Sequence, residues 1–545
     1  MRKLTKFIMI FTMFTLFLVG CGSNNTVNVT ASIEENTFVV GRNTLKFTLN
    51  VNDPKAKDDS LNSSVTAYVY ELIQGIEDEE LSLTKSKTIS KTVTEVEIDG
   101  LEETTKYRLI VKKTSGETKE LLSEDFTTTN LGSKENPIEI STYEEFVAMG
   151  DDLTAYYVLK NDIDFAEYVD DKGVSKYQSL GSSSKPFRGT LDGNGYTVRN
   201  ISNVVYSSNS YYYGLFASID YQGAVKNVTF ENITFSSKGA DDKLVAKSIE
   251  YLGIVAGYNE GIIENVTLKN VNIEYGISRS IIYVGLVSGV NDGTIENVKV
   301  EGNLKIESTT SNIYAGGVCG MIGKDVDGYG KIVSKASLNV TMDVKTSRNS
   351  LYLGGIAAES RGDIENTIVV GTLKGRSETT ATSDYKNSVI VGGIVGKHVK
   401  GYVNKNVSSL DITLESTYAK EIRVGGIVGQ PGINSISYCL SNNTIKVVFD
   451  TEDQMNQKVE EVSPYHINFV YGAKEDAEKE ATNLTDCYVS SNAFINISVQ
   501  ETTSDNKVSE NAVSTLDTTF YAETLKLSTE FWNLENLTNN MPVLK

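Results

Sequence analysis

The 545-residue chain is poor in several residue types, and each shortage excludes a class of protein. Only six residues are proline while 40% are hydrophobic, a composition typical of folded rather than disordered chains. The two histidines, His398 and His466, have no cysteine or aspartate at ligand spacing, which argues against a zinc site. Basic residues number 51 against 71 acidic ones, and the resulting charge of -20 argues against nucleic acid as the main partner, because phosphate binding needs a basic surface.

Motifs of familiar catalytic chemistry are also missing. The sequence has no Gly-x-Ser-x-Gly elbow, no P-loop and no EF-hand loop. Glycoside hydrolysis needs two carboxylates placed around one bond, whereas Asp151-Asp152 and Asp241-Asp242 stand in polar segments typical of solvated turns. We therefore predict no catalytic residue, no cofactor and no bound metal.

The apolar run near the N-terminus, Phe7 to Val19, has 13 residues, and a membrane-spanning helix needs roughly 20. Basic residues precede it, so residues 1–20 are predicted to be a secretory signal peptide. The run ends in Leu-Val-Gly-Cys at 18–21, which resembles the lipobox of bacterial lipoproteins. The resemblance implies cleavage after Gly20, lipid attachment to Cys21, a tether over 21–27, and a location on the extracellular face of the cell membrane.

Cysteine is scarce in the rest of the chain. Cys319, Cys439 and Cys487 remain, and an odd number rules out a complete set of disulfides. Cys319 stands at an apolar position of a repeated unit, and buried free cysteine behaves as a small hydrophobe. We predict that all three are structural thiols.

Residues 28–129 contain no repeat but alternate apolar and polar residues in several short segments, as half-buried strands do. This spacing of strands predicts a β-sandwich. Leu101 stands six residues before Tyr107, and a Phe126-Thr-Thr-Thr strand closes the segment, features that resemble fibronectin type III domains. The tryptophan common on the second strand of that family is missing, and Phe47 is predicted to replace it.

A glycine-led unit recurs seven times between residues 213 and 430. Its spacings are 39, 32, 32, 38, 38 and 33 residues, a period typical of solenoids. The leading glycines are Gly214, Gly253, Gly285, Gly317, Gly355, Gly393 and Gly426. Three short strands follow one another in each unit without a helical pattern, which predicts a parallel β-helix.

This unit, Gly-Leu/Ile/Val-Phe/Val-Ala/Gly followed by a turn and Gly-x-Ile-x-Asn, resembles the GLUG motif of bacterial surface proteins, which include certain IgA peptidases and filamentous adhesins. The resemblance covers 138–545. Within this range, the acidic segment near 451–482 is predicted to be an insertion, and the tail around Trp532 to be a C-terminal cap. The predicted fold class is thus all-β, a fibronectin type III or Ig-like β-sandwich followed by a parallel β-helix solenoid.

One asparagine recurs after the turn of the unit. We expect the side chains at this position to form a ladder of hydrogen bonds between coils, interrupted by Ser334 and Lys405. The four ladder residues are Asn227, Asn265, Asn297 and Asn366.

The lengths of the units vary at one point, after the third strand and before the next glycine, as at 236–250, 344–350 and 375–387. Insertions that share one face of a solenoid usually mark a binding face. Tyrosines cluster at 206 and 211–213, and suit either adhesion or edge packing of the first coil. The sequence predicts a non-catalytic cell-surface lipoprotein that binds an extracellular protein or glycan, with a polysaccharide-binding or polysaccharide-cleaving β-helix as the alternative.

Overall fold

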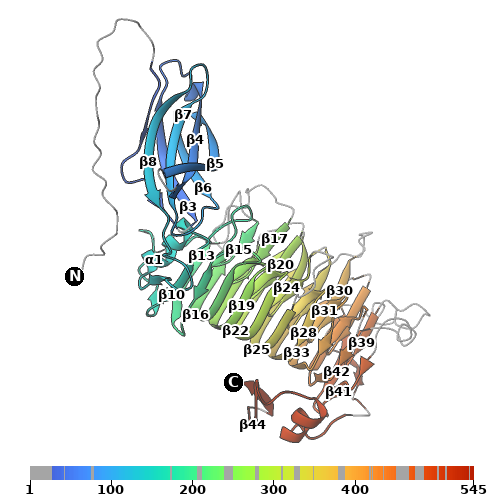
Figure 1. Cartoon of the computed structure of the whole chain (residues 1–545). Helices are drawn as coiled ribbons and strands as arrows, with labels where there is room; N and C mark the ends of the chain where they lie inside the picture. The colour runs from blue at the N-terminus through green and yellow to red at the C-terminus, as the bar shows by residue number, and fades with distance from the viewer. Residues whose placement is uncertain are drawn as a thin grey trace, which may run out of the picture. The chain divides into compact units, whose positions relative to one another are not determined.

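The computed structural model divides the chain into two compact units, Met1–Ile138 and Glu139–Lys545. It describes residues 28–545 except 42, 75–78, 172, 174, 205–210, 238–248, 277–280, 309–310, 325–331, 348, 379–386, 417–418, 420, 434, 450–464, 473–483, 500–501, 508, 510–511 and 539. The predicted signal peptide, the tether and Cys21 lie outside these ranges. Strands make up most of the described residues (Figure 1), and no described helix has the length and apolar character that a bilayer crossing requires.

The first unit consists of two antiparallel sheets that share one apolar core. One sheet contains β1 (Thr30–Ile33), β2 (Val39–Val40), β3 (Thr44–Asn52) and β6 (Val93–Asp99). The other contains β4 (Ser60–Gln74), β5 (Glu79–Lys91), β7 (Lys106–Lys113) and β8 (Lys119–Thr127). Alternate residues of β3, among them Phe47, are buried, as the period-two pattern predicts.

Tyr107 fixes the chain where it enters β7. Its ring is fully buried, and its hydroxyl oxygen accepts a hydrogen bond from the backbone N–H of Glu102 at 2.8 Å. Leu101 is buried beside it. A buried tyrosine bonded to backbone a few residues upstream is the tyrosine corner of sandwich domains.

The second unit is a parallel β-solenoid in which each full coil passes through three sheets (Figure 1). The chain enters the first sheet through β14 (Tyr212–Tyr213), β17 (Ile249–Leu252), β20 (Ile281–Gly285), β23 (Asn312–Gly316), β26 (Leu351–Gly354), β30 (Ser388–Gly392), β34 (Glu421–Gly425) and β39 (Tyr465–Asn468). It continues into the second sheet through β15 (Phe216–Ile219), β18 (Ala256–Asn259), β21 (Ser288–Asn291), β24 (Cys319–Ile322), β27 (Ala357–Ser360), β31 (Val395–His398) and β35 (Val428–Gln430).

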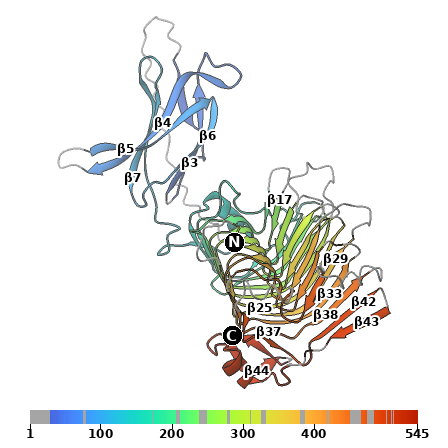
Figure 2. The same cartoon turned by 90° about the vertical axis from the view of Figure 1, so that its right-hand side faces the viewer.

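The third sheet, here called the long sheet, contains the longest strands of each coil. Its strands are β10 (Tyr156–Leu159), β11 (Ile163–Asp164), β12 (Thr190–Asp192), β13 (Thr197–Val204), β16 (Ala224–Ser236), β19 (Ile262–Tyr275), β22 (Thr294–Ser308), β25 (Ile332–Thr346), β28 (Asp363–Glu365), β29 (Ile368–Ser377), β32 (Val403–Asn404), β33 (Val407–Ser416), β36 (Ile436–Ser437), β37 (Leu440–Ser441), β38 (Thr444–Phe449), β40 (Leu484–Thr485), β41 (Tyr488–Val489) and β42 (Phe494–Val499). Strands of successive coils lie side by side in parallel register (Figure 2), and β43 (Thr502–Lys507) ends the sheet by pairing antiparallel with β42.

The observed register corrects the alignment of the glycine units. Gly285 pairs with Gly316, not with Gly317, because the later units carry two consecutive glycines where the earlier ones carry one. The column of leading glycines is therefore Gly214, Gly253, Gly285, Gly316, Gly354, Gly392 and Gly425. A Cβ at Gly285 would lie 2.3 Å from the carbonyl oxygen of Val318, so only glycine fits where the first sheet turns into the second.

The segment predicted as an insertion over 451–482 also needs correction. Its central part, β39, pairs with β34 and continues the first sheet for one more coil. Asn468 and Phe469 stand where the preceding coil has Gly425 and Gly426, so this coil lacks the glycines by which the unit is recognised in the sequence.

A short helix, α1 (Tyr143–Val147), and a 3-10 turn, η1 (Ala148–Asp151), follow β9 (Ile138–Ile140) at the start of this unit. Thr142 caps α1 by accepting a hydrogen bond from the backbone N–H of Glu145. The Glu145 carboxylate accepts its bond from Ser141 rather than from Thr142, at 2.7 Å.

The C-terminal residues, which include the π-helix Phe520–Thr524, β44 (Trp532–Thr538) and β45 (Met541–Leu544), pack against the long sheet. One set of aligned, outward-facing positions in successive coils of that sheet explains where the C-terminal residues pack. It is polar in the early coils, at Thr229, Thr267, Lys299 and Ser337, and apolar in the later ones, at Ile368, Val407 and Leu440. The apolar part is buried in one cluster with Trp532, which explains why the tail covers these coils.

The predicted ladder residues occupy a corner of the long sheet where the backbone is left-handed. Nδ2 of Asn265 donates to Oδ1 of Asn227 at 3.0 Å, and Nδ2 of Asn297 donates to Oδ1 of Asn265 at 2.6 Å. Their φ angles lie between 53° and 55°, a region that asparagine tolerates better than most residues. The next coils place Lys335, not Ser334, then Asn366 and Lys405 at this position.

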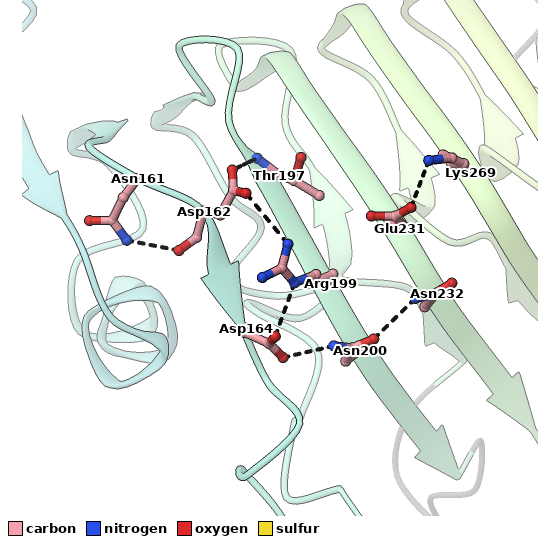
Figure 3. A network of polar contacts seen from close by, with 9 residues as sticks. All are labelled: Asn161, Asp162, Asp164, Thr197, Arg199, Asn200, Glu231, Asn232 and Lys269. Carbon is pink, nitrogen blue, oxygen red and sulfur yellow. Dashed lines mark hydrogen bonds and ion pairs between the residues drawn. The ribbon is translucent and has the colours of Figure 1, made fainter.

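A second ladder, which the sequence analysis missed, runs along the same sheet (Figure 3). Figure 3 shows the bond that Asn232 donates to Asn200 at 3.2 Å. On the next coil, Asn270 donates to Asn232 at 2.7 Å. Asn200 in turn donates to Asp164 at 2.8 Å, as Asn227 of the first ladder donates to Asp192 at 3.0 Å. Burial opposes ionisation of both aspartates, but their hydrogen bonds outweigh it and lower the pKa of each. Each ladder therefore ends on a carboxylate that accepts a charge-assisted bond.

A substitution in the first ladder tests whether the left-handed backbone conformation at this corner limits which residues fit there. Asn297→Ala should lower the free energy of unfolding by about 1–3 kcal/mol, because it removes a hydrogen bond and forces a Cβ-bearing residue without a compensating side-chain bond into the left-handed region. Asn297→Gly is the matched control, since it loses the same bond but accepts positive φ. Urea unfolding should find the glycine variant more stable than the alanine variant; the opposite order would show that the backbone conformation is not the constraint.

Candidate functional site

A single file of tyrosine rings runs along the first sheet, one ring from each of five consecutive coils. Neighbouring rings are stacked, with centroids 4.9, 5.6, 4.8 and 4.5 Å apart and ring planes within 28° of parallel. We call this feature the tyrosine row; its members are Tyr212, Tyr251, Tyr283, Tyr314 and Tyr352.

The register of the coils creates the row. Each tyrosine stands two residues before the leading glycine of its coil, so in-register pairing places the rings over one another. Parallel strands lie roughly 4.8 Å apart, a separation at which aromatic rings stack favourably. The row ends where Ile390 and then Arg423 take the same position.

The second sheet supplies an apolar wall for the start of the row. Tyr258, Val290 and Met321 form one cluster with the first three rings of the row, Tyr212, Tyr251 and Tyr283. Tyr258 meets Tyr212 and Tyr251 edge-on, at centroid distances of 5.7 and 5.9 Å. The first three rings thus contact one another through their faces and this wall along one edge.

Cationic groups accompany the row. Nζ of Lys324 lies 4.7 Å from the ring centroid of Tyr251 and 5.6 Å from that of Tyr258, and it donates a hydrogen bond to the Tyr251 hydroxyl at 2.6 Å. Nζ of Lys397 lies 6.0 Å from the ring centroid of Tyr352. All three centroid distances are within the range of cation–π attraction.

The buried carboxylate of Glu359 contacts two cationic side chains near the row, those of Arg361 and Lys397. The side chain of Glu359 is only 4% exposed, and its oxygens lie 2.8 Å from Nη2 of Arg361 and 3.7 Å from Nζ of Lys397. One carboxylate therefore faces two cations beside the row.

The exposed part of the row offers neutral hydroxyls. Tyr283, Tyr314 and Tyr352 are half-buried. Burial raises the pKa of Tyr283 to about 12, and it also raises the pKa values of Tyr314 and Tyr352. These hydroxyls stay protonated at physiological pH, so each can donate as well as accept a hydrogen bond. A file of such groups at a constant spacing suits a ligand with regularly spaced polar groups.

The residues singled out from the sequence lie elsewhere in part. Asn227, Asn265, Asn297 and Asn366 belong to the long sheet and not to the row. Of the tyrosines near 211, Tyr212 belongs to the row and packs on the next coil, while position 206 is outside the described residues. His398 is buried, with a ring nitrogen 2.9 Å from the carbonyl oxygen of Gly401, and burial lowers its pKa. Within the described ranges, no three His, Cys, Asp or Glu residues are grouped so as to hold a metal ion.

A sequence signal for the tyrosine row exists but was overlooked. Tyr-x-Gly occurs at 212–214, 251–253, 283–285, 314–316 and 352–354, always at the leading glycine of the corrected register. When the units are aligned on Gly317, Gly355 and the later second glycines, the tyrosine stands three residues before the glycine instead of two. This difference between the earlier and the later units hides the regularity.

Comparisons with known proteins find partial similarity. No model of a known protein family matches the chain. Halomucin of Haloquadratum walsbyi is 31% identical over 147 residues, which cover 26% of this chain and 2% of halomucin. A protein of Evansella cellulosilytica described as a Gly-rich membrane protein is 28% identical over 140 residues, which cover 25% of this chain and 15% of that protein. The chain thus spans a small fraction of the curated relatives it matches.

Among solved structures, an IgA1 protease superposes with a TM-score of 0.32 at 12% identity, over 79% of this chain and 29% of the protease. A score this low transfers no activity. The chain is an all-β protein with a parallel β-solenoid. Its sequence is weakly similar to two proteins, one of which is named a membrane protein.

Proposed function

We propose that this chain is a non-catalytic lipoprotein of the bacterial cell surface that binds an extracellular protein or glycan along its tyrosine row. The lipobox-like Leu-Val-Gly-Cys ending at Cys21 supports the lipid anchor, as does the basic and then apolar segment before it. The relative from Evansella cellulosilytica, which is named a membrane protein, agrees with this location.

In this proposal the first unit is a fibronectin type III-like spacer and the solenoid is a GLUG-type binding module. The buried Tyr107, bonded to the backbone of Glu102, and the two antiparallel sheets support the first assignment. The column of leading glycines, which only glycine fits, supports the second.

The binding proposal rests on one observation: the segments of variable length directly precede the strands that hold the tyrosine row. Such segments follow the ends of β13, β16, β19, β22 and β25 and precede the five first-sheet strands that hold the tyrosines. Each of these five strands thus joins a ring of fixed position to a preceding segment whose length varies from coil to coil. Tyrosine contributes rigid contact area with a polar tip at low entropic cost, which is why it is enriched in binding surfaces.

The lipid anchor is tested first. Cys21→Ser should leave the precursor uncleaved or release the protein from the membrane, because no thiol then accepts the lipid. Detergent phase partitioning of wild type and variant measures the outcome, with Cys319→Ser as the matched control that keeps the anchor. Equal recovery of the Cys21→Ser variant in the detergent phase, with normal cleavage, would refute lipid attachment at this residue.

The binding face is tested on the full-length, detergent-solubilised protein, whose ligand is first identified on an array of glycans and matrix proteins. A triple variant, Tyr283→Phe, Tyr314→Phe and Tyr352→Phe, keeps the stack and removes three hydroxyls. If each hydroxyl makes a hydrogen bond worth about 0.5–1.5 kcal/mol, Kd should rise by about tenfold or more while Tm stays nearly constant.

Tyr221→Phe is the matched control, because this tyrosine is 73% exposed and lies outside the row. Unchanged binding by the triple variant, together with loss of binding on substitution of the surface of residues 28–129, would make the first unit the binding module and the solenoid the spacer.

A polysaccharide-binding or polysaccharide-cleaving solenoid is the alternative proposal. Polysaccharide binding differs from the leading proposal only in the ligand, and the same array decides it. Release of reducing ends from a bound polysaccharide by wild type, and not by a heat-denatured sample, would establish cleavage in place of binding alone.

A further inference from the structure

Two cysteines lie opposite each other on consecutive coils. Cys439 stands between β36 and β37, and Cys487 stands between β40 and β41. Ser437 pairs with Thr485 on one side and Leu440 with Tyr488 on the other, so Cys439 and Cys487 are in register. The backbone N–H of Tyr488 donates to the carbonyl oxygen of Cys439 at 2.7 Å, which holds the two coils together at this point.

The spacing of the two residues suits a covalent bond. Neighbouring strands lie roughly 4.8 Å apart, and disulfides join residues whose Cα atoms are about 4.4–6.8 Å apart. Sγ of Cys487 leans toward the coil that carries Cys439, since it lies 3.7 Å from the carbonyl oxygen of Ile436. Both side chains are thiols in the structure.

The two thiols differ in the way that thiol–disulfide exchange requires. Cys487 is half-buried, on the coil nearer the end of the solenoid, whereas Cys439 is completely buried beneath it. A hydrogen bond from the Cys439 thiol lowers the pKa of Cys487, while burial raises the pKa of Cys439. The accessible group is therefore the one that more readily becomes a thiolate, the attacking species.

We propose that Cys439 and Cys487 are oxidised to a disulfide that clamps the last coils of the solenoid. The proposal rests on the proposed export, because disulfides persist in oxidising compartments outside the cytoplasm. Cys319 has no part in it; it is buried in β24, opposite Ser288 and Ala357.

The oxidant is a disulfide of a small-molecule or protein dithiol. The Cys487 thiolate attacks one sulfur of that disulfide, which forms a mixed disulfide and releases the first oxidant thiolate. Cys439 then loses its proton and attacks Sγ of Cys487, which forms the intrachain bond and releases the second oxidant thiolate. Two protein thiols are oxidised, one disulfide is reduced to two thiols, and both protons end on the oxidant.

The bond would hold a coil that lacks the two glycines of the repeated unit. Residues 440–486, between the two cysteines, include β39, whose coil has Asn468 and Phe469 in place of two glycines. A cross-link that closes a long loop stabilises a fold mainly by restricting the unfolded chain. The clamp thus holds the irregular coil to the regular stack.

Thiol mapping tests the proposal without any variant. Full-length protein is taken from membranes of expressing cells, quenched in acid, denatured, alkylated without reductant, digested and analysed by mass spectrometry. We expect a cross-linked peptide pair that contains Cys439 and Cys487, and alkylated Cys319. Alkylation of all three residues in that sample would overturn the disulfide.

The same digest reports on Cys21 separately, so failure of the anchor and failure of the disulfide are distinguishable. Should Cys21 carry a free thiol and the protein remain in the cytoplasm, the full chain is instead titrated with oxidised glutathione in vitro. Formation of the 439–487 pair at a potential typical of exported proteins then supports the proposal, and no formation at any ratio refutes it.

A second readout uses stability. Dithiothreitol should lower the Tm of wild type and of the matched control Cys319→Ala, and should leave the Tm of the Cys439→Ala, Cys487→Ala double variant unchanged. An equal effect of dithiothreitol on the double variant and on wild type would contradict a stabilising clamp.

Discussion

In-register pairing of parallel strands is the constraint on which the rest of this structure depends. It places equivalent residues of successive coils roughly 4.8 Å apart, so every position of the coil becomes a column of neighbouring side chains. Two columns are asparagine ladders that end on Asp164 and Asp192, one is the tyrosine row, and one brings Cys439 opposite Cys487. Each column adds a repeated contact of modest strength, and many such contacts together stabilise the stack of coils.

The tyrosine row shows how this constraint bears on function. A ring that stacks on both neighbours has little rotational freedom left to lose, so a ligand that binds its hydroxyl meets a small entropic penalty. The wall of Tyr258, Val290 and Met321 restricts the first three rings, Tyr212, Tyr251 and Tyr283, further. The row offers a fixed contact surface, and the segments that precede its strands differ in length from coil to coil.

The sequence predicted the repeated features of the fold well and the irregular ones poorly. The period of the glycines and the alternation of the strands were sufficient for a parallel β-solenoid, because both follow from local steric demands. The doubled glycine at Gly316 shifted the alignment by one residue, and that shift concealed the tyrosine row. The coil of β39 escaped detection because it lacks the glycines, and the second asparagine ladder because it ends at a β-bulge after three members.

The most direct measurement of in-register stacking is cross-linking of introduced cysteines on the exposed face of the long sheet, in a background without Cys319, Cys439 and Cys487. Glu301 and Asn339 pair across β22 and β25, whereas Thr341 pairs with Asn303. With Glu301→Cys fixed, Asn339→Cys should cross-link readily under mild oxidant. Thr341→Cys should not, because two residues along the strand put its Cα roughly 8 Å away, beyond the reach of a disulfide. Cross-linking of the shifted pair, or none in the register pair, would contradict the account.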